Sequence, residues 1–160
     1  MIALSTMIIR LLIAIVLGGI IGLERELIGK EAGLRTNIVV ASGAAIFSII
    51  SISLPYIIAT SPENLNEILA RNSGFLTVIA NIVVGIGFLG AGIILHQGSK
   101  VRSLTTAAVI WFSAAIGIAC GIGLINFAIT ATVLITSILF FTRKLFLKNL
   151  NNNNDQQDIS

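Results

Sequence analysis

The chain has 160 residues, of which 56% are hydrophobic and 11% are charged, with a formal net charge of +3. Soluble domains carry about a quarter of charged residues, whereas the mean hydropathy here is +1.00. These values exclude an ordinary soluble domain and indicate an all-α integral membrane protein. We predict a transmembrane domain over residues 1–145 and a disordered polar cytoplasmic tail over residues 146–160, because the tail is of low complexity.

Charged residues divide the sequence into apolar segments that cover residues 7–23, 37–59, 75–95, 104–122 and 124–142. Each is close to the ~17–25 residues with which a helix crosses the hydrocarbon core. We therefore predict a bundle of about five transmembrane helices. The last two segments together carry no charge and would be about twice as long as a bilayer is thick, so we expect a turn at Gly121–Gly123.

The positions of Lys and Arg predict the orientation. Placing the loop after the first segment in the cytoplasm leaves only Arg10 and Arg71 of the ten Lys and Arg residues outside. The N-terminus is then outside and the C-terminus cytoplasmic, and Arg10 is expected to reach for the headgroups. Because membrane insertion alone accounts for the basic loops, no nucleic-acid partner is expected.

The third segment contains Gly85, Gly87 and Gly90 in the pattern G-x-G-x-x-G. A dinucleotide-binding loop would need an acidic residue about 20 positions later, but no acid lies between Glu67 and Asp155. We therefore interpret the glycines as part of a membrane-spanning helix.

Helical spacing places Gly85, Gly92 and Asn81 on one side of this helix, and Gly87 and Gly90 on the opposite side. Small residues allow close helix packing in lipid, so the helix is predicted to be sandwiched between neighbours. The alternative is a narrow polar passage beside Asn81. Gly18 and Gly22 form a similar small pair in the first segment.

The first loop, residues 22–36, reads GLERELIGKEAGLRT. Its acidic and basic residues at i, i+4 spacing, Glu26 with Lys30 and Glu31 with Arg35, predict an amphipathic helix at the membrane interface. The alternative is a Mg²⁺ site formed by the carboxylates of Glu24, Glu26 and Glu31. The nearby cations disfavour this site.

The second loop, residues 96–106, reads HQGSKVRSLTT. We predict that Thr105 or Thr106 caps the fourth helix and that Arg102, together with Lys100, contacts anionic headgroups. Cys120 is the only cysteine, so no intrachain disulfide can form, and it is expected to behave as a small hydrophobic residue.

The strings GLERE, AGLRTN, GIGFLGAGII, VRSLTTAAVIW and AAIGIACGIGL occur in this order. Together they resemble the membrane domain of the MgtC/SapB family. The resemblance implies a bacterial inner-membrane protein linked to magnesium limitation and acid stress, and some members restrain the F-type ATP synthase. Many members continue beyond the membrane domain into a soluble cytoplasmic domain. The Ile- and Asn-rich composition leaves a plastid membrane as an alternative location.

The residues and the resemblance together define two candidate surfaces. The candidate functional surface comprises Glu24, Arg25, Glu26, Arg35, Thr36, Arg102, Thr105 and Thr106. The candidate packing or passage residues are Gly85, Gly87, Gly90, Gly92, Asn81 and Cys120.

Two classes of function follow. The first is a regulator that docks against a membrane ATPase or another membrane protein; the second is a transporter or an oligomeric channel for Mg²⁺ or another cation. Ionisable residues within spans normally mark ion paths, and the middles of these segments contain none, which favours the regulator. No catalytic motif is present, so neither enzymatic activity nor a cofactor is expected.

Overall fold

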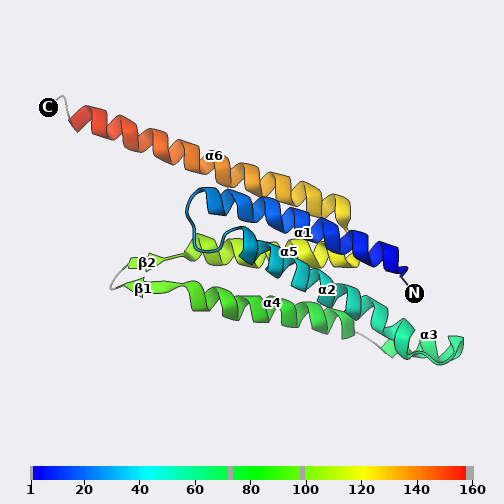
Figure 1. Ribbon diagram of the computed structural model, residues 1–160. Helices are drawn as coiled ribbons and strands as arrows, with labels where there is room; N and C mark the ends of the chain where they lie inside the picture. Colours follow the sequence, from blue (N-terminus) through cyan, green and yellow to red (C-terminus); the bar gives the residue numbers. More distant parts are fainter. Residues whose placement is uncertain (1, 72–73, 98–99, 158–160) are drawn as a thin grey trace.

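The computed structural model describes residues 2–71, 74–97 and 100–157, and these residues are mostly helical (Figure 1). Its elements, in chain order, are α1 (Leu4–Leu27), α2 (Leu34–Ile58), α3 (Pro62–Arg71), α4 (Gly74–Ile93), β1 (Leu95–Gln97), β2 (Lys100–Arg102), α5 (Leu104–Ile122) and α6 (Ile125–Gln157). Five of the described helices are long and apolar enough to cross a membrane. The prediction of an all-α bundle of about five such helices is confirmed.

The centre of the bundle consists of α1, α2 and α5, each of which contacts the other two. α4 packs against α2 and α5, and α6 packs against α1 and α5 (Figure 1). The apolar window is 61% buried in α5 but only 6% buried in α4 and 11% in α6. Apolar side chains can face lipid directly, so the outer helices expose their apolar surfaces at little cost.

Small residues allow the central helices to approach closely. A Cβ atom on Gly18 would lie 2.7 Å from the carbonyl oxygen of Asn37, and one on Gly22 would lie 2.7 Å from the Cα atom of Leu34. These two glycines are the pair that the sequence predicts. Gly117 and Gly121 of α5 pack in the same way against α2, although we do not predict them from the sequence.

The turn between α5 and α6 lies where the glycines predict it. Gly123 ends α5 with a φ of 100°, a left-handed conformation that glycine adopts without strain. Arg10 Nη1 donates a hydrogen bond of 2.8 Å to the carbonyl of Gly121. Arg10 therefore binds the C-terminal end of α5, where a cation is favoured, a contact that is not predicted from the sequence.

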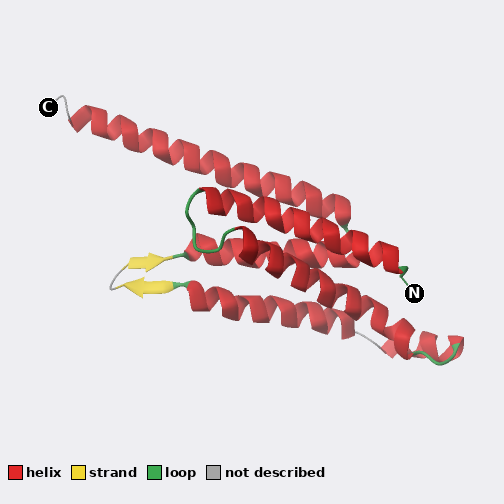
Figure 2. Ribbon diagram, in the orientation of Figure 1, coloured by secondary structure: helices red, strands yellow, loops and turns green. Residues whose placement is uncertain are grey.

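Between α2 and α4, the structure adds α3, a helix that is not among the segments predicted from the sequence. Signals for this helix are present in the sequence: Ser61 accepts a hydrogen bond of 3.2 Å from the Asn64 N–H, and Pro62 is the first helical residue. The predicted loop over residues 96–106 also differs, because β1 and β2 form an antiparallel hairpin there that pairs Leu95 with Arg102 (Figure 2).

α6 continues to Gln157, through most of the segment for which the sequence predicts disorder. No glycine or proline lies between Leu124 and Gln157, so nothing in this segment interrupts the helical hydrogen bonds. Residues 158–160 of the predicted tail lie outside the described residues.

Candidate functional site

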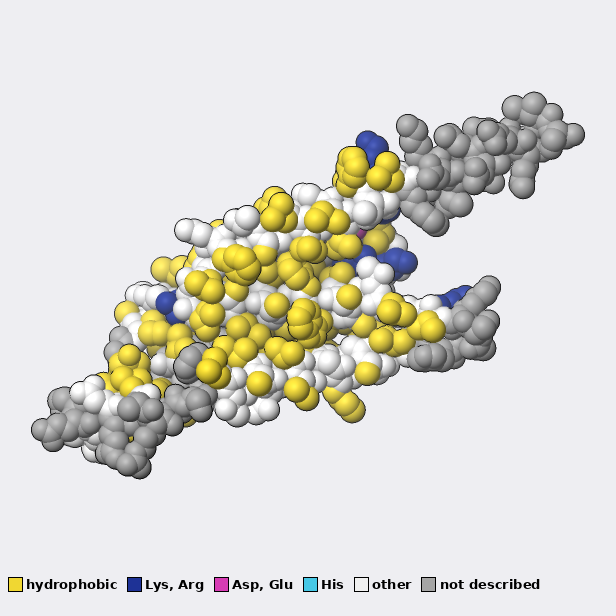
Figure 3. All heavy atoms as spheres, turned by 180° about the vertical axis from the view of Figure 1, so that it is seen from behind, with side chains coloured by type: hydrophobic (Ala, Val, Ile, Leu, Met, Phe, Trp, Pro, Cys, Tyr) yellow, Lys and Arg dark blue, Asp and Glu magenta, His cyan; other side chains and the backbone are white. Residues whose placement is uncertain are grey.

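The two loops that carry the candidate functional surface meet at one end of the bundle. Residues 28–33 and the hairpin lie at the same end (Figure 2), and Ser103 Oγ donates a hydrogen bond of 3.0 Å to Glu31 Oε2. We call this the basic end, because it exposes the side chains of Lys30, Arg35, Arg102, Arg143 and Lys144. Figure 3 shows hydrophobic side chains over the middle of one face and Lys and Arg side chains near the point where α6 projects.

The first loop is not an amphipathic helix. α1 continues to Leu27, residues 28–33 connect the helices, and α2 begins at Leu34, so the i, i+4 pairs expected in this loop do not lie within one helix. Instead, Glu26 Oε2 accepts a hydrogen bond of 2.7 Å from the Leu34 N–H. This carboxylate thereby stabilises the N-terminus of α2, where unpaired N–H groups and the helix dipole favour an anion.

The three carboxylates of the alternative Mg²⁺ site have separate partners. Glu24 Oε2 lies 3.7 Å from Arg25 Nη1, Glu26 binds the Leu34 N–H, and Glu31 binds Ser103. Within residues 2–71, 74–97 and 100–157, no group of three or more His, Cys, Asp or Glu side chains could hold a metal ion.

The start of α5 differs from its prediction. Ser103 is the N-cap residue, in a left-handed conformation with a φ of 64°, and no side chain caps the helix. The prediction that Thr105 or Thr106 caps α5 is therefore wrong, because both residues lie within the first turn rather than before it. Thr105 is exposed, whereas Thr106 is buried.

Sequence reasoning missed Asn37, which is fully buried near the start of α2. Its Nδ2 donates hydrogen bonds to the carbonyls of Ala32 and Gly33, at 2.9 and 2.8 Å, and its Oδ1 accepts one of 2.6 Å from Ser113 Oγ. Asn37 thus joins the first loop to α2 and α5. An amide directly after Arg35 and Thr36, at the start of an apolar segment, is the sequence signal that could have indicated it.

Arg25 is also buried, with 3% of its surface exposed. It lines a cavity of about 500 Å³ between the end of α1, the start of α5 and α6. Candidate residues Glu24, Thr105 and Thr106 line the same cavity. The cavity also contacts residues that were not among the candidates, including Lys30, Ser103, Leu139, Thr142 and Arg143.

The remaining residues of the candidate functional surface lie elsewhere. Thr36 lines a second cavity of about 360 Å³ together with Glu31 and Gly92. Arg35 and Arg102 are exposed and do not line the Arg25 cavity. The structure thus brings together only part of the predicted surface.

The glycine pattern of the third segment is helical in α4, as predicted, but α4 is not sandwiched between neighbours within this chain. A Cβ atom on Gly85, Gly87 or Gly92 would meet no atom within 4 Å, whereas one on Gly90 would lie 3.5 Å from Ala107 Cβ. The expectation fails because the close approaches in this bundle are made by the glycines of α1 and α5. Three of the four candidate glycines therefore have open space beside them.

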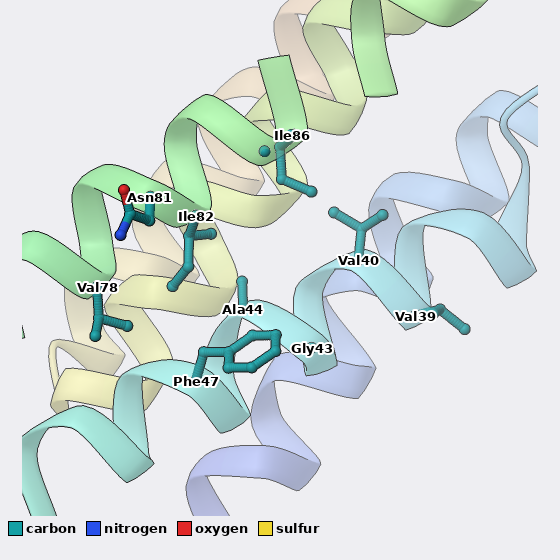
Figure 4. Close-up of a pocket in the computed structure, with 10 residues that line it drawn as sticks. Val39, Val40, Gly43, Ala44, Phe47, Val78, Asn81, Ile82 and Ile86 are labelled. Carbon is teal, nitrogen blue, oxygen red and sulfur yellow. The ribbon is translucent and has the colours of Figure 1, made fainter. Parts of the chain in front are cut away.

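α2 and α4 border a groove of about 480 Å³, which Asn81 and Gly85 line. Figure 4 shows Ile82 and Ile86 of α4 pointing toward the Ala44 and Val40 side of α2. Asn81 is the one residue with a polar side chain among those that line the groove. The groove is therefore an apolar surface at membrane depth rather than a polar passage.

Cys120 is fully buried in α5, in a cluster that also contains Leu17 and Ala45. It packs as a small hydrophobic residue, as predicted, and does not line the groove between α2 and α4.

Comparison with known proteins identifies the family of this chain. Residues 11–147 match the MgtC family. Protein MgtC of Brucella suis biovar 1 (strain 1330) is 46% identical over 132 residues, which are 82% of this chain and 49% of that protein. Protein MgtC of Salmonella typhimurium (strain LT2) is 45% identical over 128 residues, or 80% of this chain and 48% of that protein.

The chain thus spans about half the length of the curated relatives it matches. No solved structure matches it. The family match covers all of α2 to α5 and most of α1 and α6. This chain, with its five helices long and apolar enough to cross a membrane, therefore belongs to the MgtC family.

Proposed function

We propose that this chain is a non-enzymatic regulator in a bacterial inner membrane, which acts by docking against another membrane complex during magnesium limitation or acid stress. F-type ATP synthase is the partner that we propose, since the family resemblance implies it. In this proposal the basic end faces the cytoplasm, in keeping with the positive-inside rule.

The observation that carries the proposal is the exposed surface of α4. Gly85, Gly87 and Gly92 have open space beside them, and Phe88 is 84% exposed. Lipid tails pack against any apolar side chain, but small residues specifically allow another helix to approach closely. Gly87 lies on the side of α4 opposite Gly85 and Gly92, and its open side therefore fits a transmembrane helix of a partner better than it fits lipid alone.

Charge placement supports a regulator over an ion-coupled transporter. Charged residues in such transporters normally line the ion path. Here the charged side chain of Arg10 binds the end of α5. Among the residues that line the α2–α4 groove, Asn81 is the one with a polar side chain, and none is charged. The alternative is a passive cation channel formed by several copies of the chain, with Asn81 at the pore.

The test uses a strain that lacks the protein and carries the full gene in wild-type or variant form. Cellular ATP and growth are measured in magnesium-poor medium. Gly87→Leu fills the open space on α4, so we expect it to keep the fold and the expression level but to lose the effect on ATP and growth.

Ala108→Leu is the control, since Ala108 is an exposed residue of α5 and also becomes leucine. Full activity of Gly87→Leu, at equal expression, would contradict docking through α4. If restoring the wild-type gene changes cellular Mg²⁺ but not ATP, the result would instead favour the channel. Asn81→Leu would then be expected to abolish the change in cellular Mg²⁺.

A further inference from the structure

The cavity beside Arg25 has the composition of an anion-binding site. The side chains of Arg25, Lys30 and Arg143 contribute three positive charges, and Glu24 contributes one negative charge, which gives a net charge of +2. Hydroxyl groups of Ser103, Thr105, Thr106 and Thr142 line the same space. The cavity of about 500 Å³ is large enough to hold a small charged group.

Arg25 is the central group of this cavity. Its side chain is only 4% exposed, and its closest anionic group, Glu24 Oε2, is 3.7 Å from Nη1. Its Nε and Nη2 atoms are buried, and neither has a hydrogen-bond partner among the residues that the structure describes. Nε and one Nη of a guanidinium form a planar fork that matches two oxygens of a carboxylate or phosphate. Arg25 therefore lines the cavity with a buried guanidinium whose Nε and Nη2 lack hydrogen-bond partners, and the neighbouring Glu24 Oε2 is likewise buried without one.

The N-terminus of α5 adds a second source of positive potential. α5 has 19 residues and begins beside the cavity, without a side-chain cap. The first-turn N–H groups of a helix have no acceptor within the helix, and the helix dipole favours an anion at this position. No side chain caps these N–H groups, and the Ser103 hydroxyl donates its hydrogen to Glu31.

We propose that this cavity binds a phosphate group, with Arg25 as the bidentate ligand and with Arg143, Lys30 and the start of α5 completing the charge. A phosphate fits better than a carboxylate because the donors approach from three elements, α1, α5 and α6, and a phosphate offers oxygens in several directions. Apolar residues such as Ile28 and Leu139 also line the cavity, so the phosphate can carry an organic group. This proposal is independent of the docking surface on α4.

A phosphate group at this place could belong to an anionic lipid headgroup or to a free solute, and two measurements distinguish them. The full-length protein is purified in detergent, and its thermal unfolding is measured with sodium phosphate against sodium chloride at equal ionic strength. Native mass spectrometry then measures how much phosphatidylglycerol is retained, relative to phosphatidylcholine. Saturable stabilisation by phosphate indicates a solute, and selective retention of phosphatidylglycerol indicates a lipid.

The variants decide whether the cavity is responsible. Arg143→Gln removes an exposed cation that lines the cavity, and we expect it to weaken phosphate or phosphatidylglycerol binding about tenfold; Arg25→Gln should weaken it about 100-fold. Arg102→Gln removes a cation from the same end outside the cavity and should change binding by less than about twofold. If Arg25→Gln does not fold, Arg143→Gln alone decides.

Equal losses in Arg143→Gln and Arg102→Gln would overturn the proposal, because they would indicate attraction by the general charge of the basic end. Failure of the wild-type protein to bind either phosphate or phosphatidylglycerol would also overturn it. Neither result would bear on the ATP and growth phenotype of Gly87→Leu, so the two proposals fail separately.

Discussion

Replacing Gly117 by alanine tests the close packing between α2 and α5. A Cβ atom on Gly117 would lie 2.9 Å from the carbonyl carbon and 3.0 Å from the Cα atom of Ala41, and closer still to the Ala41 carbonyl oxygen. These are backbone atoms, so no rotamer change can relieve the overlap, and α2 and α5 must move apart. The movement would loosen the most buried helix of the bundle, α5.

The magnitude follows from two opposing effects. Overpacking costs up to about 3 kcal/mol when the surroundings cannot adjust, whereas alanine is favoured over glycine within a helix by about 1 kcal/mol. We therefore expect Gly117→Ala to lower the free energy of unfolding by about 2 kcal/mol. Unfolding by SDS in mixed micelles, followed by the fluorescence of the single Trp111 and by circular dichroism, measures this difference.

Gly87→Ala is the matched control. It makes the same chemical change in another membrane-spanning helix, at a position where the new Cβ atom meets nothing within 4 Å. We expect a stability equal to wild type or up to about 1 kcal/mol higher. If Gly117→Ala proved as stable as Gly87→Ala, the proposed close contact between α2 and α5 would be refuted.

Two further substitutions test polar contacts. Asn37→Ala removes the hydrogen bonds to Ala32, Gly33 and Ser113. At about 0.6 kcal/mol for each bond in a bilayer, the free energy of unfolding should fall by about 2 kcal/mol. Ser113→Ala removes one of these bonds, so an equal loss in the two variants would contradict this expectation. Arg10→Met removes the cation from the end of α5, so amide hydrogen exchange at Gly123 should accelerate; unchanged exchange there would contradict the capping role.

Much of the fold could be predicted because the bilayer restricts it. The thickness of the hydrocarbon core sets the length of a spanning helix, and the charged residues between spans separate one helix from the next. The turn at Gly123 could be predicted for the same reason, since one uninterrupted helix from Leu104 to Thr142 is too long. The helical state of the glycine pattern around Gly85 could be predicted because the acidic residue that a dinucleotide-binding loop needs is missing from the sequence.

The side of each helix that meets a neighbour could not be predicted. Along an apolar span there is no polar face to indicate which side points outward, so spacing alone cannot distinguish the packed Gly117 from the open Gly87. The burial of Arg25 was hidden for a related reason. It lies within a charged string, and only the continuation of α1 to Leu27 places it beside α5 and α6.

The hydrogen bond between Arg10 and Gly121 has a consequence for biosynthesis. The two residues are 111 positions apart, so the first helix reaches the membrane long before its partner has been translated. At about 5 to 20 residues per second, the delay is roughly 6 to 22 s. During that time the guanidinium of Arg10 must be accommodated by water, lipid phosphates or the insertion machinery. The first helix therefore gains its contacts with α5 only after α5 has entered the bilayer, and its contacts with α6 form later still, so the centre of the bundle closes late in synthesis.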